Sequence, residues 1–440
     1  MKLGISAGWL RCFLLQRIRL FALFSILTIL VIASPIKNAG GAINLWINTP
    51  LISFYSPLNV DQTHADEKVV LNQTSYQNDP APLIKLKFRL DKIQIGFIQN
   101  FAVRNHQIFL LGSYGLAILD LDQNQTPIKR FRNTPVGIDN RSQIWYLTDN
   151  STSIFRWDGQ TTTEYRKEQG WILPAKFSNP PIPQQRTSFF NEGQKIWLAT
   201  SSDVRFYNGE NWRIFTANEI GIQLPYKVGV ESIFTINSNP SNGYIWTAAC
   251  YWQDSRQVGG SVPFYFDGKT WRRSDFPEEN PCITSIIFSS DGSGFFTTPT
   301  SIWVYDGQAW SEIFSPQIQN LPQNTTYRIS QVWMDHSESP WFLAKLINLN
   351  GLVTQYILFH YTGTTLKMVS SLEGFAQPQI FFTSSGSVIC FRINQLFLLT
   401  PTGWVLLGDN KFDLVAQDNH SNVWLISDIK NRPVLWELIE

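Results

Sequence analysis

Short runs in which apolar and polar residues alternate recur from about residue 83 to the end of the chain. Each repeated unit begins with a β-branched run and a polar turn that often contains aspartate. A strand of the type Ile-Trp-x-x-Thr follows, and then a third strand that ends on an aromatic residue. An Asx-Gly turn then leads into a fourth strand that begins with tryptophan. Asx-Gly between two alternating runs is a strong hairpin signal, because both turn residues need a positive φ.

The Asx-Gly phrase is the most regular part of this unit. It reads WDG at residues 157–159, YNGENW at 207–212, FDGKTW at 266–271 and YDGQAW at 305–310, with weaker forms YTGTTL at 361–366 and PTGW at 401–404. A phrase that recurs at a fixed interval indicates an array of similar structural units.

Eight second strands are predicted in this array. They lie at residues 108–111, 144–148, 196–200, 245–249, 295–298, 341–344, 388–391 and 423–427. The mean unit of about 45 residues is the length of a four-stranded propeller blade. The sequence therefore predicts an all-β fold, a single closed β-propeller over residues 82–440. We expect eight blades, with seven as the alternative if one terminal unit is a cap.

The two ends of the array predict how the ring closes. The eighth unit stops after its third strand, at residues 434–439, and residues 83–90 form a lone strand ahead of the first unit. We expect the early strand to complete the last blade, because closure removes exposed sheet edges.

The region before the propeller resembles an export segment. Lys2, Arg11, Arg17 and Arg19 precede an uncharged, mostly apolar run at residues 20–32. Basic residues ahead of an apolar run place the N-terminus inside and the remainder outside the cytoplasm. Residues 1–36 are thus predicted to be a signal peptide or an uncleaved signal-anchor helix, and residues 37–81 a linker or stalk. The protein would be extracytoplasmic, either secreted or anchored to the membrane by that helix.

Composition narrows the class of partner. The formal net charge is +1, from 35 basic and 34 acidic residues, and aromatic residues make up 14% of the chain. This balance gives no reason to expect nucleic acid as a partner. The aromatic content is sufficient for a large buried core.

Three turn-plus-strand segments carry a family resemblance. DNRSQIWYLT at 139–148, DHSESPWFLA at 335–344 and DNHSNVWLIS at 418–427 resemble the two-component regulator propeller repeat. The chain departs from that repeat where glycine is expected in the turn, because Ser142, Glu338 and Ser421 occupy the position. The resemblance implies an extracytoplasmic propeller that senses ligands and is often fused to a kinase or cyclase. The printed sequence ends at Glu440, within the propeller array.

The position of the long loops predicts a binding face. The Asx-Gly and Asp-containing turns share one face of a propeller, and the long insertions fall on the other. Function usually resides on loops held by a rigid scaffold. The candidate binding residues on these loops are Trp171, Lys176, Tyr226, Tyr251, Trp252, Asp254 and Arg256. Aromatic rings beside charges suit a glycan or a peptide. The alternative for Trp252 is that it packs its own loop onto the blade.

The repeated tryptophans and aspartates have structural explanations. Tryptophans in second and fourth strands are expected to pack between blades. Asp139, Asp335 and Asp418 are expected to cap their turns, as carboxylates commonly do. No nucleophile, zinc or phosphate-binding motif occurs in a fitting context, so we predict no catalytic residue, no cofactor and no metal ion.

Cysteines are few. Cys250 ends a second strand and Cys282 opens the next blade, so both lie at the loop-rich face of adjacent blades, and the sequence allows a disulfide between them, with two free thiols as the alternative. Cys390 lies within a strand and is expected to be a buried free thiol.

These observations leave three hypotheses for function. The first is a non-enzymatic binding or sensing module outside the cytoplasmic membrane, with an unknown protein, peptide or glycan as its ligand. The second is an enzyme that acts on glycans or peptides through the loop-rich face. The third is a structural scaffold in an envelope complex.

Overall fold

The protein is described by a computed structural model. It describes residues 41–43, 68–70, 83–90, 93, 95, 98–113, 115–120, 128–130, 133–148, 152–172, 188–192, 194–200, 202–225, 230–253, 256–314, 325–407, 411–418, 420–428 and 433–439. Of the predicted leader at residues 1–36, nothing lies within the described residues.

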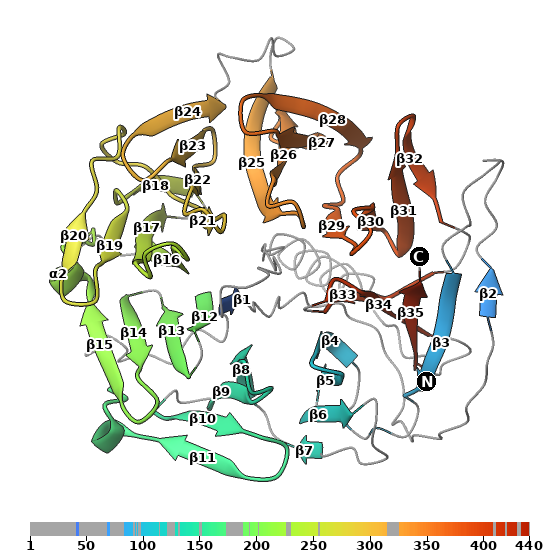
Figure 1. The fold of residues 1–440 in the computed structure, drawn as a ribbon, viewed down its shortest axis with the longest axis horizontal. Coiled ribbons are helices and arrows are strands. Elements are labelled where there is room, and N and C mark those ends of the chain that lie inside the picture. The colour runs from blue at the N-terminus through green and yellow to red at the C-terminus, as the bar shows by residue number, and fades with distance from the viewer. Residues whose placement is uncertain are drawn as a thin grey trace, which may run out of the picture.

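Eight antiparallel sheets form a closed ring (Figure 1). Blade 1 is β4–β7 (Ile98–Arg104, Gln107–Gly112, Gly115–Asp120, Ile128–Arg130) and blade 2 is β8–β11 (Asn133–Ile138, Ile144–Thr148, Ile154–Trp157, Thr162–Tyr165). Blade 3 is β12–β15 (Ser188–Glu192, Lys195–Ala199, Asp203–Tyr207, Trp212–Thr216). Blade 4 is β16, β17, β19 and β20 (Val230–Ser238, Ile245–Gln253, Phe264–Phe266, Trp271–Arg273).

The second half of the ring has the same plan. Blade 5 is β21–β24 (Ser285–Phe288, Gly294–Thr297, Ile302–Tyr305, Trp310–Phe314) and blade 6 is β25–β28 (Thr325–Met334, Pro340–Asn348, Val353–Tyr361, Leu366–Glu373). Blade 7 is β29–β32 (Gln379–Phe382, Val388–Arg392, Gln395–Thr400, Gly403–Leu406). Blade 8 is β33–β35 (Leu414–Gln417, Val423–Asp428, Pro433–Ile439) with β3 (Leu83–Arg89). The prediction of eight blades is confirmed.

The ring closes as the sequence predicted. β3 pairs antiparallel with β35, with Leu83 opposite Ile439 and Arg89 opposite Val434. The last blade is therefore completed by a strand from the opposite end of the propeller sequence. Lys87 and Glu437 add an ion pair at 2.5 Å between these two strands.

Three further strands extend blades beyond four. β18 (Arg256–Gly260) pairs with β17 in blade 4. The other two come from the region expected to be an irregular stalk: β1 (Gly41–Ile43) pairs with β12, and β2 (Lys68–Val70) pairs with β3. Two short strands therefore lie within the segment predicted to be a linker or stalk.

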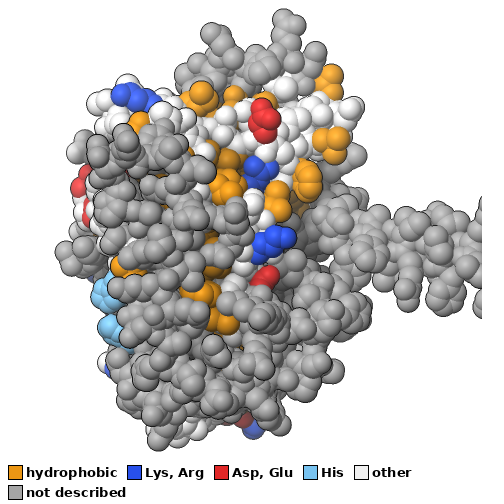
Figure 2. Space-filling model, turned by 90° about the vertical axis from the view of Figure 1, so that its right-hand side faces the viewer, with side chains coloured by type: hydrophobic (Ala, Val, Ile, Leu, Met, Phe, Trp, Pro, Cys, Tyr) orange, Lys and Arg blue, Asp and Glu red, His pale blue; other side chains and the backbone are white. Residues whose placement is uncertain are grey.

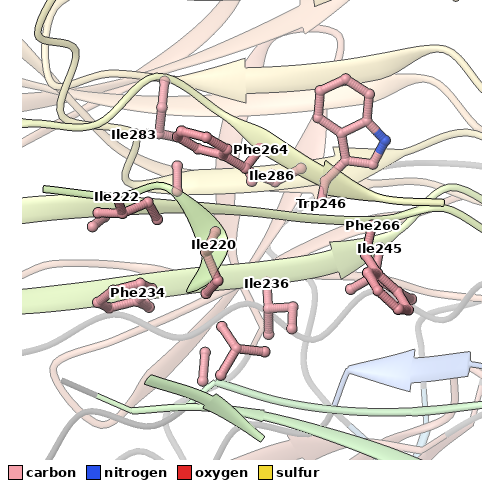
Figure 3. Packing of buried hydrophobic residues seen from close by; sticks show 14 of the residues in the cluster. Ile220, Ile222, Phe234, Ile236, Ile245, Trp246, Phe264, Phe266, Ile283 and Ile286 are labelled. Carbon is pink, nitrogen blue, oxygen red and sulfur yellow. The ribbon is translucent and has the colours of Figure 1, made fainter. Parts of the chain in front are cut away.

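The core lies between neighbouring blades. In the largest cluster, Phe234, Ile236 and Trp246 of blade 4 pack with residues of blades 3 and 5 (Figure 3). The repeated second-strand tryptophans are buried in these interfaces, as Trp145, Trp197 and Trp424 illustrate. Alternation along each strand places one row of side chains against each neighbour, so every blade is apolar on both sides.

The Asp-containing turns are built around a carboxylate. Asp139 Oδ1 accepts from the backbone N–H of Gln143 at 3.0 Å, and Asp139 Oδ2 accepts from Trp145 Nε1 at 2.8 Å. Asp335 makes the same two bonds, with Ser339 and Trp341, and Asp418 makes them with Asn422 and Trp424. Turn capping by these aspartates is confirmed, and each carboxylate also anchors a core indole.

Helical structure among the described residues is limited to η1 (Lys167–Gln169) and α2 (Ala217–Ile220). Thr216 caps α2 by accepting from the N–H of Glu219, whose side chain accepts in return from Thr216. No helix within the described ranges is long and apolar enough to span a membrane.

Candidate functional site

The two faces of the propeller differ in construction. The turn face carries the connections from first to second and from third to fourth strands, such as the turns at 158–161, 208–211, 267–270 and 306–309. The loop face carries the connections from second to third strands and from blade to blade. The Asx-Gly turns on this face have backbone groups that are satisfied locally; Asp267 Oδ1, for example, accepts from the N–H groups of Lys269 and Thr270.

Blades 4 and 6 project farther on the loop face than blade 5 between them. β16 and β17 are 9 residues long and β25 is 10, whereas β21 and β22 of blade 5 are 4 each. The strands on either side of blade 5 are thus five or six residues longer than β21 and β22. At about 3.3 Å per residue, they extend roughly 17 to 20 Å farther. We call these projections the blade 4 arm (residues 230–233, 250–253 and 256–260) and the blade 6 arm (residues 325–329 and 345–354).

A disulfide fastens the blade 4 arm. Cys250 in β17 is bonded to Cys282, which precedes blade 5, with the two Cα atoms 4.4 Å apart. These are the two cysteines between which the sequence allows a disulfide. Close approach in the same place requires glycine, because a Cβ on Gly260 would lie 2.1 Å from the carbonyl oxygen of Pro281. Cys390 is a buried free cysteine, and burial raises the pKa of its thiol to about 12.

Three of the predicted site residues, Tyr251, Trp252 and Arg256, lie on this arm. Tyr251 is only 8% exposed, and its hydroxyl donates to the carbonyl of Gln223 at 2.9 Å. Burial raises the pKa of Tyr251 to about 12. Trp252 is half-buried, and the Arg328 guanidinium of the blade 6 arm lies 5.4 Å from its ring centroid. Trp252 thus contacts the other arm across blade 5, besides the packing within its own loop.

The remaining predicted residues are not brought together. Trp171 is 3% exposed, packs edge-on against Trp212 and is covered by Arg205, whose guanidinium lies 4.2 Å from the ring. This burial corrects its assignment to an open binding surface, because the indole fills a core interface. Lys176, Tyr226 and Asp254 lie outside the described residues. Arg256 begins β18, and its side chain is likewise outside the description.

The blade 6 arm holds cations that sequence reasoning missed. Arg328 and Lys345 are directly opposite each other in the β25–β26 ladder, and Tyr356 is opposite Lys345 in β27. Burial lowers the pKa of Arg328, and burial followed by the nearby charge of Arg328 lowers the pKa of Lys345. Strand register brings these cations together, and the sequence alone does not provide it.

Exposed apolar side chains gather on the loop face. Leu349 (78% exposed) and Leu352 (63%) lie at the tip of the blade 6 arm, while Phe375 (82%) and Ile393 (64%) lie on neighbouring loops of blades 6 and 7. Arg392 joins these loops by donating to the carbonyl oxygens of Ala376 and Glu373. Figure 2 views the side on which β3 and β32 lie and shows hydrophobic side chains at the surface among basic and acidic ones. Contiguous exposed apolar side chains mark interaction surfaces.

Among the described residues no group of three or more His, Cys, Asp or Glu side chains is placed to hold a metal ion. His106 and His420 approach each other on the turn face, with ring centroids 6.4 Å apart. Both occupy first-to-second-strand turns of adjacent blades, as the repeat would place them.

The fold and its two faces define a closed eight-bladed β-propeller with one elaborated face. No protein-family model matches the sequence. A search of curated proteins also finds no match.

Solved structures do resemble the chain. A streptogramin B lyase is 13% identical with a TM-score of 0.40, covering 69% of this chain and 93% of that one. The extracellular domain of a putative hybrid two-component system from B. thetaiotaomicron is 13% identical with a TM-score of 0.36, covering 85% of this chain and 52% of that one. Apo AztD from Citrobacter koseri is 9% identical with a TM-score of 0.39, covering 76% and 94%. At these values the likeness says nothing about what the chain binds.

Proposed function

We propose that the protein is a non-enzymatic binding or sensing module that presents its loop face to a ligand or partner outside the cytoplasmic membrane. The observation that carries this proposal is the asymmetry of the two faces. Tight, internally satisfied turns occupy the turn face, whereas the loop face carries two projecting arms and the apolar residues Leu349, Leu352, Phe375 and Ile393. Such side chains are stabilised by burial against something other than water.

Two observations support an extracytoplasmic setting. The leader at residues 1–36 has the charge and hydropathy pattern of an export segment. The Cys250–Cys282 disulfide is of a kind that persists in oxidising compartments. The repeated Asp–Trp turns at Asp139, Asp335 and Asp418 support a place among two-component regulator propellers, and hence a role in sensing.

The test begins with a binding screen of the full chain on glycan and peptide arrays. Hydrogen exchange with the strongest hit then locates its site. We expect protection at residues 250–260, 345–354 and 374–378, and loss of binding in Leu349→Ser/Leu352→Ser. Met368→Ser is the matched control, because Met368 is 65% exposed on the outer strand β28. Protection confined to the turns at 158–161 and 267–270 would contradict the proposal.

A further inference from the structure

The first described strand runs through the ring in a defined direction. β1 pairs antiparallel with β12, the inner strand of blade 3, with Gly41 opposite Glu192 and Ile43 opposite Phe190. Figure 1 shows β1 on the inner side of β12, toward the middle of the ring. β12 runs from the loop face at Ser188 to the turn face at Glu192, because the turn into β13 follows it. Gly41 therefore lies at the turn face, and β1 runs from there toward the loop face.

The turn-face end of β1 is close in sequence to the predicted export segment. Residues 20–36 are 17 successive uncharged and mostly apolar residues. This length is the lower limit for a helix that spans a membrane. Only residues 37–40 separate the run from Gly41. An extended chain covers at most about 3.6 Å per residue, so Ile36 lies no farther than about 18 Å from Gly41.

The length of this link decides which face of the propeller meets a membrane. From the turn face, the link needs only to reach the end of β12. From the loop face, it would have to follow β12 for four residues and also pass the arms of blades 4 and 6, whose strands of 9 and 10 residues exceed the 5 residues of β12. At about 3.3 Å per residue, these two stretches together require roughly 26 Å or more. The link is too short for that approach.

We propose that residues 20–36 remain as a membrane anchor and hold the propeller with its turn face against the lipid surface and its loop face directed away from it. This inference rests on the extracytoplasmic setting in the proposed function, and it adds that the partner approaches from the side opposite the membrane. The turn face suits a flat surface because its connections are tight turns, such as those at 158–161, 208–211 and 267–270. The two arms occupy the opposite face.

The pairing of β1 with β12 is what makes the tether short. The next described attachment along the chain is β2, which begins at Lys68 and pairs with β3. Without β1, the link would comprise residues 37–67 and reach up to about 110 Å. A tether of that length would allow either face to meet the membrane, so the orientation depends on these three residues.

Energy transfer from a fluorophore on the protein to rhodamine-labelled lipid tests the orientation. The full chain, carrying Cys12→Ser, is reconstituted into vesicles of phosphatidylcholine and phosphatidylglycerol and labelled at Thr364→Cys or Asn350→Cys. Both positions are exposed in blade 6. Thr364 lies in the turn at 362–365 on the turn face, and Asn350 lies at the tip of the blade 6 arm on the loop face.

The two labels are far enough apart for a clear result. β27 joins the two ends of blade 6 and is 9 residues long, which corresponds to about 30 Å. Transfer from the label at Thr364→Cys should be severalfold stronger than transfer from the label at Asn350→Cys. Stronger transfer from Asn350→Cys would place the arm tips at the bilayer and overturn the proposal.

A pair of prolines tests whether β1 sets the orientation. Successive N–H groups of a strand point to opposite edges, so Gly41→Pro/Ala42→Pro removes a donor that faces β12 whichever residue provides it. The difference between the two labels should then shrink, because the released tether reaches either face. Asn38→Pro/Ala39→Pro in the link is the matched control and should keep the difference. An undiminished difference in the β1 variant would contradict the inference.

The fate of the leader separates this inference from the proposed function. Failure of the full chain to float with the vesicles, or a mature N-terminus directly after Ala33 when the protein is expressed and exported, would show that residues 20–36 are no anchor. Either result overturns the orientation and leaves the proposed function standing if an array ligand still protects residues 345–354. Turn-face placement with no array ligand at all would instead overturn the proposed function and leave the orientation.

Discussion

Three residues in the repeated turns carry backbone strain that glycine would avoid. Ser142, Glu338 and Ser421 adopt positive φ values of 60°, 59° and 68°, where blades 5 and 7 place Gly292 and Gly386. Left-handed backbone is unfavourable for residues with a Cβ. Ser142, Glu338 and Ser421 therefore have a direct structural cost at these three turns.

Ser421→Gly should stabilise the protein by about 1 kcal/mol, because it relieves that strain and removes a buried hydroxyl that has no hydrogen-bond partner. Gly386→Ala is the reciprocal change; a Cβ there would meet nothing within 4 Å, so its cost of about 1 kcal/mol would come from the backbone alone. Thermal unfolding followed by circular dichroism measures both. Equal unfolding temperatures for all three proteins would contradict the strain argument.

His360 links stability to pH. Its ring stacks on Trp341 with centroids 4.2 Å apart, and Nε2 lies 3.9 Å from Asp335 Oδ2. Burial lowers the pKa of His360 below 6.5, Asp335 opposes this, and Lys367 adds to it. The unfolded chain therefore binds more protons at this residue, and stability falls as the pH drops below 6.5 toward the folded-state pKa.

His360→Phe keeps an aromatic ring on Trp341 and removes the titration. We expect its unfolding free energy to decline less steeply than that of the parent protein between pH 7 and pH 5. Denaturant unfolding at a series of pH values measures the two slopes. A steeper decline in the variant would show that the Asp335 attraction outweighs burial.

At the scale of elements, the disulfide determines how firmly the blade 4 arm is held. Cys250 and Cys282 are separated by 32 positions, a loop for which cross-linking contributes about 3 to 4 kcal/mol. Cys250→Ala/Cys282→Ala should lower the unfolding temperature, and reductant should lower that of the parent protein to a similar value. Cys390→Ala is the control and should retain the full response to reductant. A double variant that still responds to reductant would contradict this account.

The elements were predictable to different degrees. The Asx-Gly turns and the Ile-Trp strands repeat, so the position of strands such as β13 and β34 follows from the sequence. β1 and β2 are 3 residues each and carry no repeat, and they form only because an open sheet edge accepts them. The candidate site depends on register and arm length. The contact of Trp252 with Arg328 joins blades 4 and 6, and no local sequence pattern predicts it.

The outer strand of blade 6 has features that oppose pairing with another chain. β28, at 8 residues the longest outer strand of the described blades, has a register shift opposite Leu358 and Phe359 and carries the exposed Lys367. Bulges and lysines on an outer strand discourage pairing with another chain. The outer edge of blade 6 is therefore ill suited to sheet extension by another chain.

At the scale of the whole molecule, closure depends on one strand. β3 pairs along β35, and Leu90 and Ile95 beyond it are buried in the cluster shared by blades 8 and 1. A chain that begins at residue 82 should fold as a monomer. A chain that begins at residue 91 would leave β35 as an open edge, and we expect it to self-associate. Light scattering after size-exclusion chromatography distinguishes them. A monomeric, equally stable shorter chain would show that the closing strand is dispensable.

The pairing of Leu83 with Ile439 also imposes an order of events in time. Ribosomes add about 5–20 residues per second, so β3 waits roughly 20 to 70 seconds for its partner to be made. During that interval the earlier blades assemble while the amphipathic strand β3 remains unpaired. A factor that shields nascent chains would find its target there, and synthesis of β35 decides when it is released.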